Sequence, residues 1–509
     1  MAEKFERATF TRNFLKTITR IKKPEEMLEE AKSGGLEKTL GVWDLIILGV
    51  GAIIGSGIFA VVGIAAAGSA DGSSLGAGPA LVISMVVAAI ACIFSALCYS
   101  EFATMIPVSG GAYIYTFATL GEFAAWMVGW VLMLEYAIGF IAVACAWSNH
   151  FVQFMQGFSN YLPVWMVNPE YLVPSVFGIT LNLPAIIIVL LSTAILVKGT
   201  KDSTKMAGIM VFVKLAVIAL FVVAGAFFVK PDNWTPFAPN GVEGIFAGAF
   251  LIFFAYIGFD ALATAAEECK NPQKDLPIGI IGSLLVTTVV YVLVALVLTG
   301  LQDTSSPVPA GFLQAPMAYC MSLHNMNWAA GLISIGSLAG LTSVLLVLQM
   351  AATRILFAMS RDHFISKRFQ KLHPKFKTPA LLTWTVGLLS VVGVLTLNLD
   401  VAAELCNYGT FTSFIIVCVA VLILRKTDPD RERPFKVPFS PFLPAMGIIC
   451  CGGLMIYKST QQSDSALLFP IWLGIGAIFY LLYGFVKNRM NENKLHNERV
   501  QQRKEELQQ

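Results

Sequence analysis

A glycine cluster inside an apolar stretch constrains this chain more than any other feature of its sequence. Gly49, Gly51, Gly55 and Gly57 lie in an uncharged run over 45–68, long enough as a helix to cross a bilayer core of ~30 Å. Each glycine costs a helix interior roughly 0.8–1 kcal/mol relative to alanine. We therefore predict an interrupted helix whose freed amides and carbonyls lie at mid-membrane. Lipid tolerates such groups only where they line a cavity or bind a ligand.

Other interpretations of the same glycines must be weighed. The spacing from Gly51 to Gly55 is also typical of a small-residue packing face between membrane helices, and a plain flexible kink would use the same residues. The run from Gly55 to Ala60 matches a dinucleotide-binding fingerprint. That fingerprint needs a preceding strand in a βαβ unit, whereas the flanks here are continuous apolar sequence. We therefore reject the dinucleotide interpretation. The rest of the sequence must distinguish between an interrupted helix, a packing face and a flexible kink.

The composition is typical of a polytopic membrane protein. The 509 residues are 56% hydrophobic and only 13% charged, which lies outside the range of soluble domains. The nine cysteines show no C-x-x-C spacing and the five histidines no metal-site spacing. We expect no metal, no cofactor and no nucleic-acid partner. Residues 1–42 lack the short apolar core of a removable signal peptide.

Twelve apolar segments follow one another along the chain. They span 43–68, 79–105, 122–154, 183–198, 206–229, 244–266, 276–300, 328–358, 379–397, 401–424, 441–457 and 467–486. With the N-terminus inside, Lys230 and Lys458 lie in outer loops and Lys214 lies within a segment. All other Lys and Arg residues fall on the inner side. This distribution obeys the positive-inside rule and predicts twelve transmembrane helices in the cell membrane, with both termini cytoplasmic.

The sixth segment repeats the peculiarity of the first, because Gly258 and Asp260 lie halfway along it. Segments 1 and 6 begin two blocks of five segments and cross the membrane in opposite directions. Interrupted helices at matching positions of two inverted halves indicate a transport site at the membrane midplane. This favours the cavity interpretation of 49–59 over the packing and kink interpretations.

The chemistry of an interrupted helix suggests the ligand. Unpaired amides at a half-helix start favour an anion such as a carboxylate, and freed carbonyls suit an ammonium group. A zwitterionic α-amino acid presents both groups. The backbone would then bind the part common to all amino acids, while side chains select the variable part.

Three charged residues lie deep in apolar segments. Lys214 is about halfway through segment 5, and a lysine there is a functional candidate by default. It could release and take up a proton during transport, or serve as a permanently charged structural anchor. Glu135 and Asp260 are the deep acids, and either would pair with a hydroxyl or carry a proton. Before the first segment, residues 5–32 form a basic amphipathic stretch. It fits either a helix on the inner membrane surface or a partly ordered arm.

Three motifs in this order resemble those of the amino acid-polyamine-organocation transporter superfamily, and most of all bacterial members of its cationic amino acid transporter branch. They occupy 51–59, 98–102 with 107–113, and 258–260 with 265–268, within a resemblance that covers about 36–486. The resemblance implies an all-α fold with a five-plus-five inverted repeat, broken helices 1 and 6, and two further helices. It divides the chain into an N-terminal arm (1–42), two repeats (43–230 and 231–425), helices 11 and 12 (426–486) and a cytoplasmic tail (487–509).

The resemblance also implies a binding site. The substrate carboxylate would meet the backbone at Ile54, Gly55, Ser56 and Gly57. The amino group would meet the carbonyls of Ile53, Phe254 and Ile257, with Phe254 also serving as an aromatic gate. Lys214 matches a lysine that takes the place of a sodium ion in some relatives, which implies proton coupling or sodium independence. Thr342 and Ser343 on segment 8 would be its neighbours.

Leu341 on segment 8 is expected to face the ligand and favours a neutral side chain of small to medium size. A cationic side chain would need an acid to offset its desolvation, and Asp260 or Glu135 could supply it. We therefore predict a permease that imports neutral amino acids together with protons. Cationic amino acids and exchange of one amino acid for another remain the alternatives. A membrane sensor is disfavoured by the short tails, and no nucleophile–base or metal constellation indicates an enzyme. A small membrane partner is left open.

Overall fold

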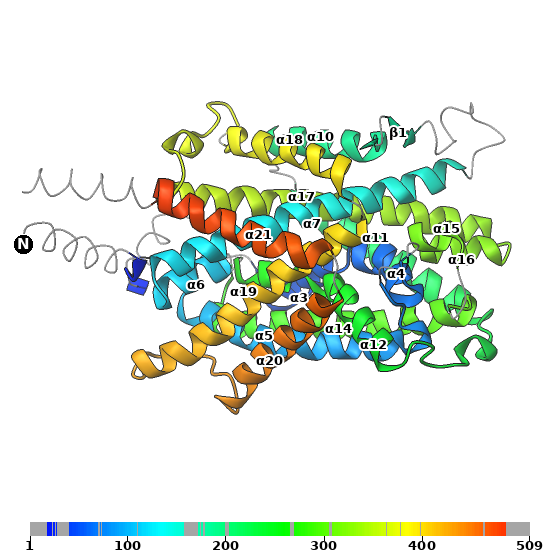
Figure 1. Cartoon of the computed structure of the whole chain (residues 1–509), viewed down its shortest axis with the longest axis horizontal. Helices are drawn as coiled ribbons and strands as arrows, with labels where there is room; N and C mark the ends of the chain where they lie inside the picture. The colour runs from blue at the N-terminus through cyan, green and yellow to red at the C-terminus, as the bar shows by residue number, and fades with distance from the viewer. Residues whose placement is uncertain are drawn as a thin grey trace, which may run out of the picture.

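The computed structural model describes residues 18–22, 24–25, 27, 40–69, 72, 74–108, 110–156, 172–173, 175–176, 179–198, 203–264, 269–304, 308–362, 364–376, 378–397, 399–461 and 464–484. Within these ranges the chain is almost entirely helical, and the long helices run roughly side by side (Figure 1). The strands β1 (Ser175–Val176) and β2 (Ile179–Thr180) form one short antiparallel pair. Most of the amphipathic stretch over 5–32, Glu267, Glu268 and the tail over 487–509 lie outside the described residues.

Each of the twelve predicted apolar segments coincides with a helix or with consecutive helices. The uninterrupted ones are α5 (Leu81–Met105), α7 (Glu122–Gln156), α10 (Leu183–Lys198), α11 (Ser203–Ala226), α14 (Pro272–Leu301), α17 (Asn327–Arg361), α18 (Ala380–Thr396), α19 (Leu399–Thr427), α20 (Phe442–Thr460) and α21 (Asp464–Phe479). The shorter elements between or beside them are η2 (Gly78–Ala80), α6 (Gly111–Thr119), η3 (Pro231–Trp234), α15 (Ala310–Gln314), α16 (Pro316–Leu323), η6 (Lys367–Gln370) and η7 (Tyr480–Gly484).

The helices have the length and surface expected in a membrane. Among the described residues, eight helices are long and apolar enough to cross one, or nine if the bent pair at 42–67 is one span. Three further apolar helices are shorter, at Leu183–Lys198, Gly241–Tyr256 and Ala380–Thr396. Large apolar side chains such as Ile187, Phe212 and Leu389 are exposed. Apolar surface on this scale marks contact with lipid or with another protein.

The predicted interruption of the first segment is present. Its first half, α3 (Val42–Ile53), ends at Ile54, whose backbone is extended. The chain resumes at Gly57 with the π-helical turn η1 (Gly57–Val61) and continues as α4 (Val62–Ala67). The two halves are bent by 45° relative to each other. Because the backbone leaves the helical path here, this is a break and not a gentle kink.

The sixth segment is broken in the same way. It consists of α12 (Gly241–Ile252), η4 (Phe253–Tyr256) and α13 (Phe259–Thr264). Between η4 and α13, Ile257 is extended and Gly258 has a φ of +126°, which glycine adopts at little cost. A Cβ on Gly258 would also lie only 2.7 Å from the Ala52 carbonyl oxygen. The second break therefore touches the first.

Two glycines of the first segment serve different roles, one in helix packing and one at the helix break. A Cβ on Gly51 would lie 2.3 Å from Val211 Cγ2, so this residue lets α3 pack against α11. A Cβ on Gly57 would lie 2.3 Å from the Ala255 Cα, so this residue lets η1 cross the second break. The small-residue packing and the interrupted helix thus occur together, six residues apart.

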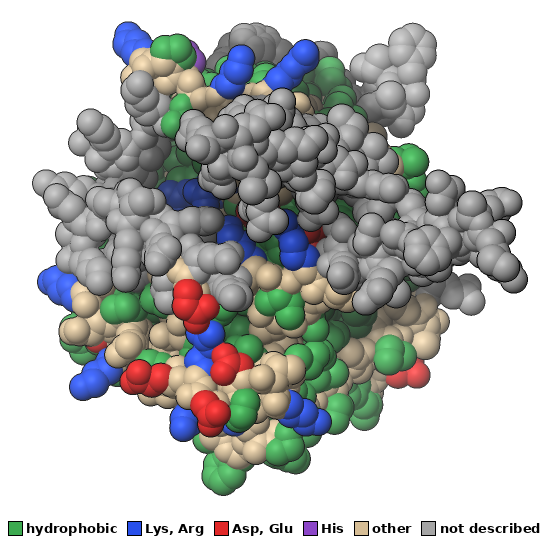
Figure 2. All heavy atoms as spheres, turned by 90° about the vertical axis from the view of Figure 1, so that its left-hand side faces the viewer, with side chains coloured by type: hydrophobic (Ala, Val, Ile, Leu, Met, Phe, Trp, Pro, Cys, Tyr) green, Lys and Arg blue, Asp and Glu red, His purple; other side chains and the backbone are tan. Residues whose placement is uncertain are grey.

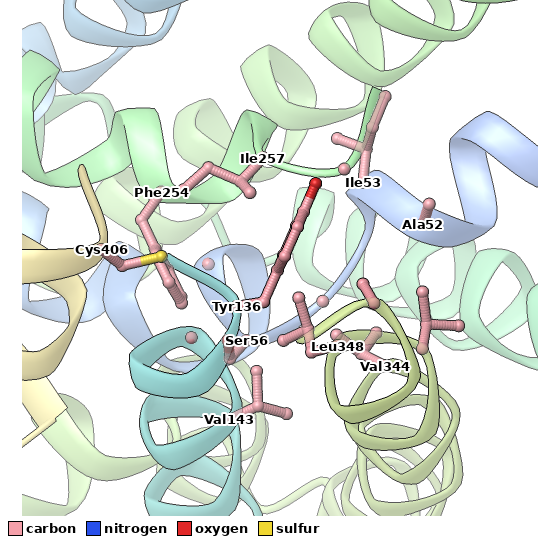
Figure 3. Close-up of a pocket in the computed structure, with 16 residues that line it drawn as sticks. Ala52, Ile53, Ser56, Tyr136, Val143, Phe254, Ile257, Val344, Leu348 and Cys406 are labelled. Atoms are coloured by element: carbon pink, nitrogen blue, oxygen red, sulfur yellow. The ribbon is translucent and has the colours of Figure 1, made fainter. Parts of the chain in front are cut away.

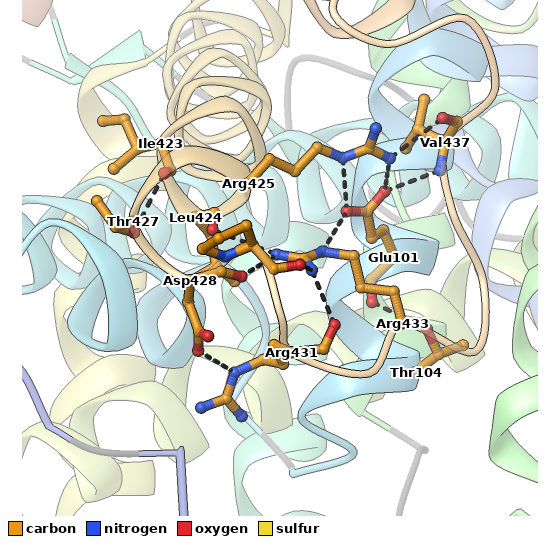
Figure 4. A network of polar contacts seen from close by, with 11 residues as sticks. Glu101, Thr104, Ile423, Leu424, Arg425, Thr427, Asp428, Arg431, Arg433 and Val437 are labelled. Carbon is orange, nitrogen blue, oxygen red and sulfur yellow. Dashed lines mark hydrogen bonds and ion pairs between the residues drawn. The ribbon is translucent and has the colours of Figure 1, made fainter.

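A charged cluster fixes the connection between α19 and α20 against α5 (Figure 4). Glu101 near the end of α5 is fully buried. Its carboxylate accepts from Arg425 Nε at 3.0 Å, from Arg425 Nη2 at 2.5 Å and from the Val437 amide at 2.8 Å. Arg433 Nε lies 3.5 Å from the same carboxylate. A buried carboxylate with this many donors is stable only while its partners remain.

Lys458, which the sequence placed in an outer loop, is buried in the last turn of α20. It forms an ion pair with Glu404 on α19, and Ser465 Oγ donates to the same carboxylate at 2.6 Å. The helix continues past the end of the apolar segment because this pair compensates the lysine charge. The Glu404 carboxylate of α19 therefore joins Lys458 of α20 and Ser465 of α21.

Replacing Glu101 by Gln should destabilise the fold. The substitution keeps the side-chain shape but leaves Arg425 and Arg433 without their counter-charge, which should lower the free energy of unfolding by roughly 3–5 kcal/mol. Thermal unfolding of the purified protein in detergent measures this. The control is Asp428→Asn, which removes the partly exposed pair with Arg431 and should cost less than about 1 kcal/mol. Equal effects of the two substitutions would contradict the assigned role of Glu101.

Candidate functional site

A pocket lies where the two helix breaks meet (Figure 3). It is bounded by the breaks, by α7 and α17, and by one residue of α19. Its lining consists of Ala52, Ile53, Gly55, Ser56, Gly57, Tyr136, Gly139, Val143, Phe254, Ile257, Gly258, Val344, Val347, Leu348, Ala351 and Cys406. None of these 16 residues carries a formal charge, so the pocket offers backbone groups, two hydroxyls, a thiol and apolar side chains.

Most of the predicted binding residues lie in this pocket. Those that line it are Ile53, Gly55, Ser56, Gly57, Phe254 and Ile257. Ile54 and Leu341 are buried but are not part of the lining. The lining of α17 comes instead from the following turns of the same face, which begin at Val344. Leu341 lies about one turn before Val344 on the face of α17 that lines the pocket.

The Ser56 hydroxyl is the most informative polar group in the pocket. It is buried, and it has no hydrogen-bond partner among the described residues. A buried hydroxyl without a partner costs free energy. A ligand with a polar group in this pocket would remove that cost.

Lys214 inserts its ammonium group into the first break. From α11, Nζ donates to the Gly51 carbonyl oxygen at 2.9 Å and to the Ile54 carbonyl oxygen at 3.0 Å. The lysine side chain passes Gly340 on α17, where an added Cβ would lie 2.8 Å from Lys214 Cγ. A lysine therefore satisfies two of the carbonyls that the break leaves without helical partners.

Thr342 and Ser343, the predicted neighbours of Lys214, make other hydrogen bonds. Trp147 Nε1 donates to Thr342 Oγ1 at 3.1 Å, and Thr342 Oγ1 lies 2.7 Å from the Leu338 carbonyl oxygen. Ser343 Oγ donates to the Gly340 carbonyl oxygen at 2.8 Å. Among the described contacts, α17 approaches Lys214 through Gly340.

Tyr291 is a site residue that the sequence interpretation missed. Its hydroxyl reaches from α14 to both breaks, 3.1 Å from the Ile53 carbonyl oxygen and 2.8 Å from the Ala255 carbonyl oxygen. A tyrosine in the middle of an otherwise apolar segment needs a partner for its hydroxyl. The need for a hydrogen-bond partner was the signal available in the sequence. The partners of the Tyr291 hydroxyl could be identified only from the fold.

The two deep acids face different surroundings. Asp260 accepts from the Tyr136 hydroxyl at 2.6 Å and from the Gly258 amide at 3.2 Å. Tyr136 lines the pocket, so Asp260 contacts a pocket-lining residue without lining the pocket itself. Glu135 faces α19, where Ser413 Oγ lies 3.5 Å from Oε2. Its Oε1 has no partner among the described residues. Neither carboxylate lines the pocket.

The arrangement is suited to binding a small molecule. Within the described residues, no group of His, Cys, Asp and Glu side chains is placed to hold a metal ion. The lining presents backbone groups of the two breaks and the Ser56 and Tyr136 hydroxyls next to mainly apolar side chains. Such a mixture is typical of a small-molecule site with a few polar groups that orient the ligand.

Comparison with known proteins assigns the family. The sequence pattern described as "Amino acid permease" matches residues 40–487. The methylthioribose transporter of Bacillus subtilis (strain 168) is 42% identical over 472 residues, which are 92% of this chain and 99% of that protein. The branched-chain amino acid permease BcaP of the same organism is 43% identical over 473 residues, covering 92% and 98%. Cationic amino acid transporter 9, chloroplastic, of Arabidopsis thaliana is 34% identical over 452 residues, covering 87% and 77%. This chain therefore belongs to the amino acid permease family of the amino acid-polyamine-organocation superfamily, and it is a multi-pass membrane transporter and not an enzyme.

Proposed function

We propose that this permease imports a neutral amino acid of small to medium size across the cell membrane by alternating access. The observation that carries the proposal is the pocket between two touching helix breaks, with an uncharged lining and a buried, unpartnered Ser56 hydroxyl. Backbone groups at such breaks are the usual means by which transporters bind small polar substrates at the midplane.

In the proposed complex, the substrate carboxylate meets the backbone amides at 54–57 and the Ser56 hydroxyl. The amides at 55–57 lead into the second half-helix at the positive end of its dipole, whereas the Ile54 amide already donates to the Val50 carbonyl oxygen at 2.9 Å. The ammonium group meets the carbonyls of Ile53, Phe254 and Ile257. The Tyr291 hydroxyl already lies within 3.1 Å of the Ile53 oxygen, so this carbonyl would use its second lone pair for the substrate.

The apolar side chains of the pocket would select the substrate side chain. Val143 on α7 and Val344, Val347 and Leu348 on α17 suit an aliphatic group. The name of the BcaP relative, a branched-chain amino acid permease, agrees with this preference. The names of the cationic transporter relatives keep arginine and lysine as the alternative. A cationic head would have to share Asp260 with its present donors, Tyr136 and Gly258.

For coupling, we propose that Lys214 carries the transported proton. While charged, its ammonium group holds the Gly51 and Ile54 carbonyls together. Loss of the proton would weaken both bonds, so that the first break could rearrange as the substrate leaves. The exchange alternative uses the same pocket without net proton movement. A role for Lys214 as a permanently charged anchor would give the same contacts without pH dependence.

The proposed architecture places twelve helices in the membrane as a five-plus-five inverted repeat with two additional helices. The coincidence of all twelve predicted segments with helices supports it, as do the matching breaks at 54–56 and 257–258. We propose the repeat boundaries 43–230 and 231–425, with α20 and α21 following. The distribution of Lys and Arg supports cytoplasmic termini.

Ligand-dependent thermal unfolding of the purified protein tests the substrate class. At a concentration of 100 Kd, a ligand that binds only the folded state should add about 2.7 kcal/mol to its stability. We expect leucine, isoleucine, valine or alanine to raise the unfolding temperature, and arginine and lysine to leave it unchanged. A shift with arginine and lysine alone would favour the cationic alternative. Methylthioribose belongs in the same screen, and a shift with it alone would overturn the proposed substrate class.

Replacing Gly55 by Val should abolish binding in the pocket. A Cβ at this position already lies 3.3 Å from Val344 Cγ2, so the added methyl groups would occupy space that the substrate needs. Kd should rise by at least about tenfold, which is about 1.4 kcal/mol. Binding of radiolabelled substrate measures the change. The control is Gly453→Val on α20, where an added Cβ meets nothing within 4 Å. Wild-type affinity of the Gly55 variant would refute this binding site.

Replacing Lys214 by Ala should abolish accumulation driven by a pH gradient while leaving substrate exchange measurable. The variant lacks the proton carrier, although the pocket lining is unchanged. Uptake into proteoliposomes with and without an imposed pH gradient distinguishes the two activities. The matched control removes another buried lysine together with its partner, as Lys458→Met with Glu404→Gln. Gradient-driven accumulation that survives in Lys214→Ala would leave this lysine a structural role.

A further inference from the structure

The segment over residues 18–22, hereafter the strap, lies across one end of the helix bundle. Figure 2 faces this end, where Lys, Arg, Asp and Glu side chains gather. The backbone of the strap is docked closely, because the Lys22 amide donates to the Phe117 carbonyl oxygen of α6 at 3.3 Å. A Cβ on Gly121 would lie 3.0 Å from the Ile18 carbonyl oxygen. The strap therefore sits directly on the junction between α6 and α7.

Arg20 binds the strap to the start of α7. Its Nε lies 2.9 Å from Glu122 Oε2, and its guanidinium carbon lies 5.8 Å from the centre of the Phe117 ring. The Glu122 side chain is fully buried, and its other oxygen accepts from the Tyr480 hydroxyl at 3.2 Å. A buried carboxylate requires compensation, and the strap supplies the cation.

Lys22 binds the strap to the end of α17. Its Nζ lies 3.5 Å from Asp362 Oδ1, while the Tyr113 hydroxyl of α6 donates to Asp362 Oδ2 at 2.6 Å. Asp362 thus joins the strap, α6 and α17 through one carboxylate. The Lys22 and Asp362 side chains are 16% and 17% exposed, so water can compete for this pair.

Directly beneath these ion pairs, aromatic side chains fill the space between the helices. Tyr113 is fully buried and contacts the rings of Phe117 and Phe364 at their edges. A Cβ on Gly129 of α7 would lie 2.8 Å from Met359 Sδ of α17 and 3.2 Å from Tyr113 Cδ2. The ends of α6, α7 and α17 are therefore closed against one another where the strap crosses them.

We propose that the strap is a latch that holds this mouth of the transport pathway closed. The Lys22–Asp362 pair separates when α6 and the end of α17 part to release substrate, while Arg20 stays paired with the buried Glu122 carboxylate and keeps the strap on α7. This inference rests on the proposed transport function, in whose orientation the latched mouth is the inner one. Arg20 and Lys22 are positioning residues, since neither touches the pocket.

Cys406 is a natural reporter for this opening, because its thiol is buried in the pocket lining. We would measure its alkylation by a charged, membrane-impermeant maleimide, by mass spectrometry of the full chain, in inverted vesicles and in whole cells. The test variant is Arg20→Gln with Lys22→Gln. Alkylation in inverted vesicles should accelerate roughly tenfold, which corresponds to about 1.4 kcal/mol, and alkylation in whole cells should not accelerate.

Two matched variants control the experiment. Arg20→Lys with Lys22→Arg keeps both positive charges and should retain the wild-type rate. Lys371→Gln removes an exposed lysine that follows α17 and should also retain it. An unchanged rate in the double Gln variant would overturn the latch. An equal acceleration from both sides would also overturn it, because it would reflect general loosening of the fold.

Protection of Cys406 by substrate separates the latch from the proposed function. Wild-type protein should be protected from alkylation by the amino acid that raises its unfolding temperature. Protection together with an unchanged rate in the double Gln variant would overturn the latch alone. Faster one-sided alkylation without protection by any amino acid would support the latch and overturn the proposed substrate site.

Discussion

Backbone groups without helical partners are the constraint on which this structure depends. Two helices are broken at 54–56 and 257–258 inside an apolar bundle, where water is scarce and each unpaired carbonyl costs free energy. Donors from other helices meet this cost. Lys214 on α11 reaches the first break, and Tyr291 on α14 reaches both. The breaks therefore determine which helices must surround them.

The same balance of hydrogen-bond donors and acceptors explains why some polar groups of the pocket have no partner among the described residues. Lys214 and Tyr291 supply donors to carbonyls, whereas no charged side chain among the described residues accepts from the amides that begin the second half of the first helix. The Ser56 hydroxyl is also without a partner among the described residues. In the complex that we propose, a ligand carboxylate would complete the set, because the helix start favours negative charge. Bound substrate would then help to stabilise the closed arrangement of the two helix breaks.

Structural features that depend on residue type could be predicted from the sequence. Features that depend on which helices are in contact could not. Glycine in a helix interior is costly wherever it occurs, so both breaks were predictable. A buried lysine needs acceptors in any fold, so the sequence already predicted that Lys214 would bind polar groups, and its Nζ donates to two carbonyl oxygens of the first break. Which turn of α17 reaches the pocket depends on the depth at which helices pack, and Leu341 was therefore expected where Val344 lies. Tyr291 and the Lys458–Glu404 pair required knowledge of which helices are neighbours.

The ion pairs of this protein differ in a way that separates fixed from movable parts. Glu101 is almost inaccessible to solvent and accepts from Arg425 and the Val437 amide, so separating α5 from the connection after α19 would leave a buried charge without compensation. Asp362 and Lys22 are 3.5 Å apart and partly hydrated, so water can replace each partner when they separate. A transporter needs both fixed and movable ion pairs. Permanent pairs maintain the scaffold during the cycle, and pairs at the mouth must be weak enough to break once in every turnover.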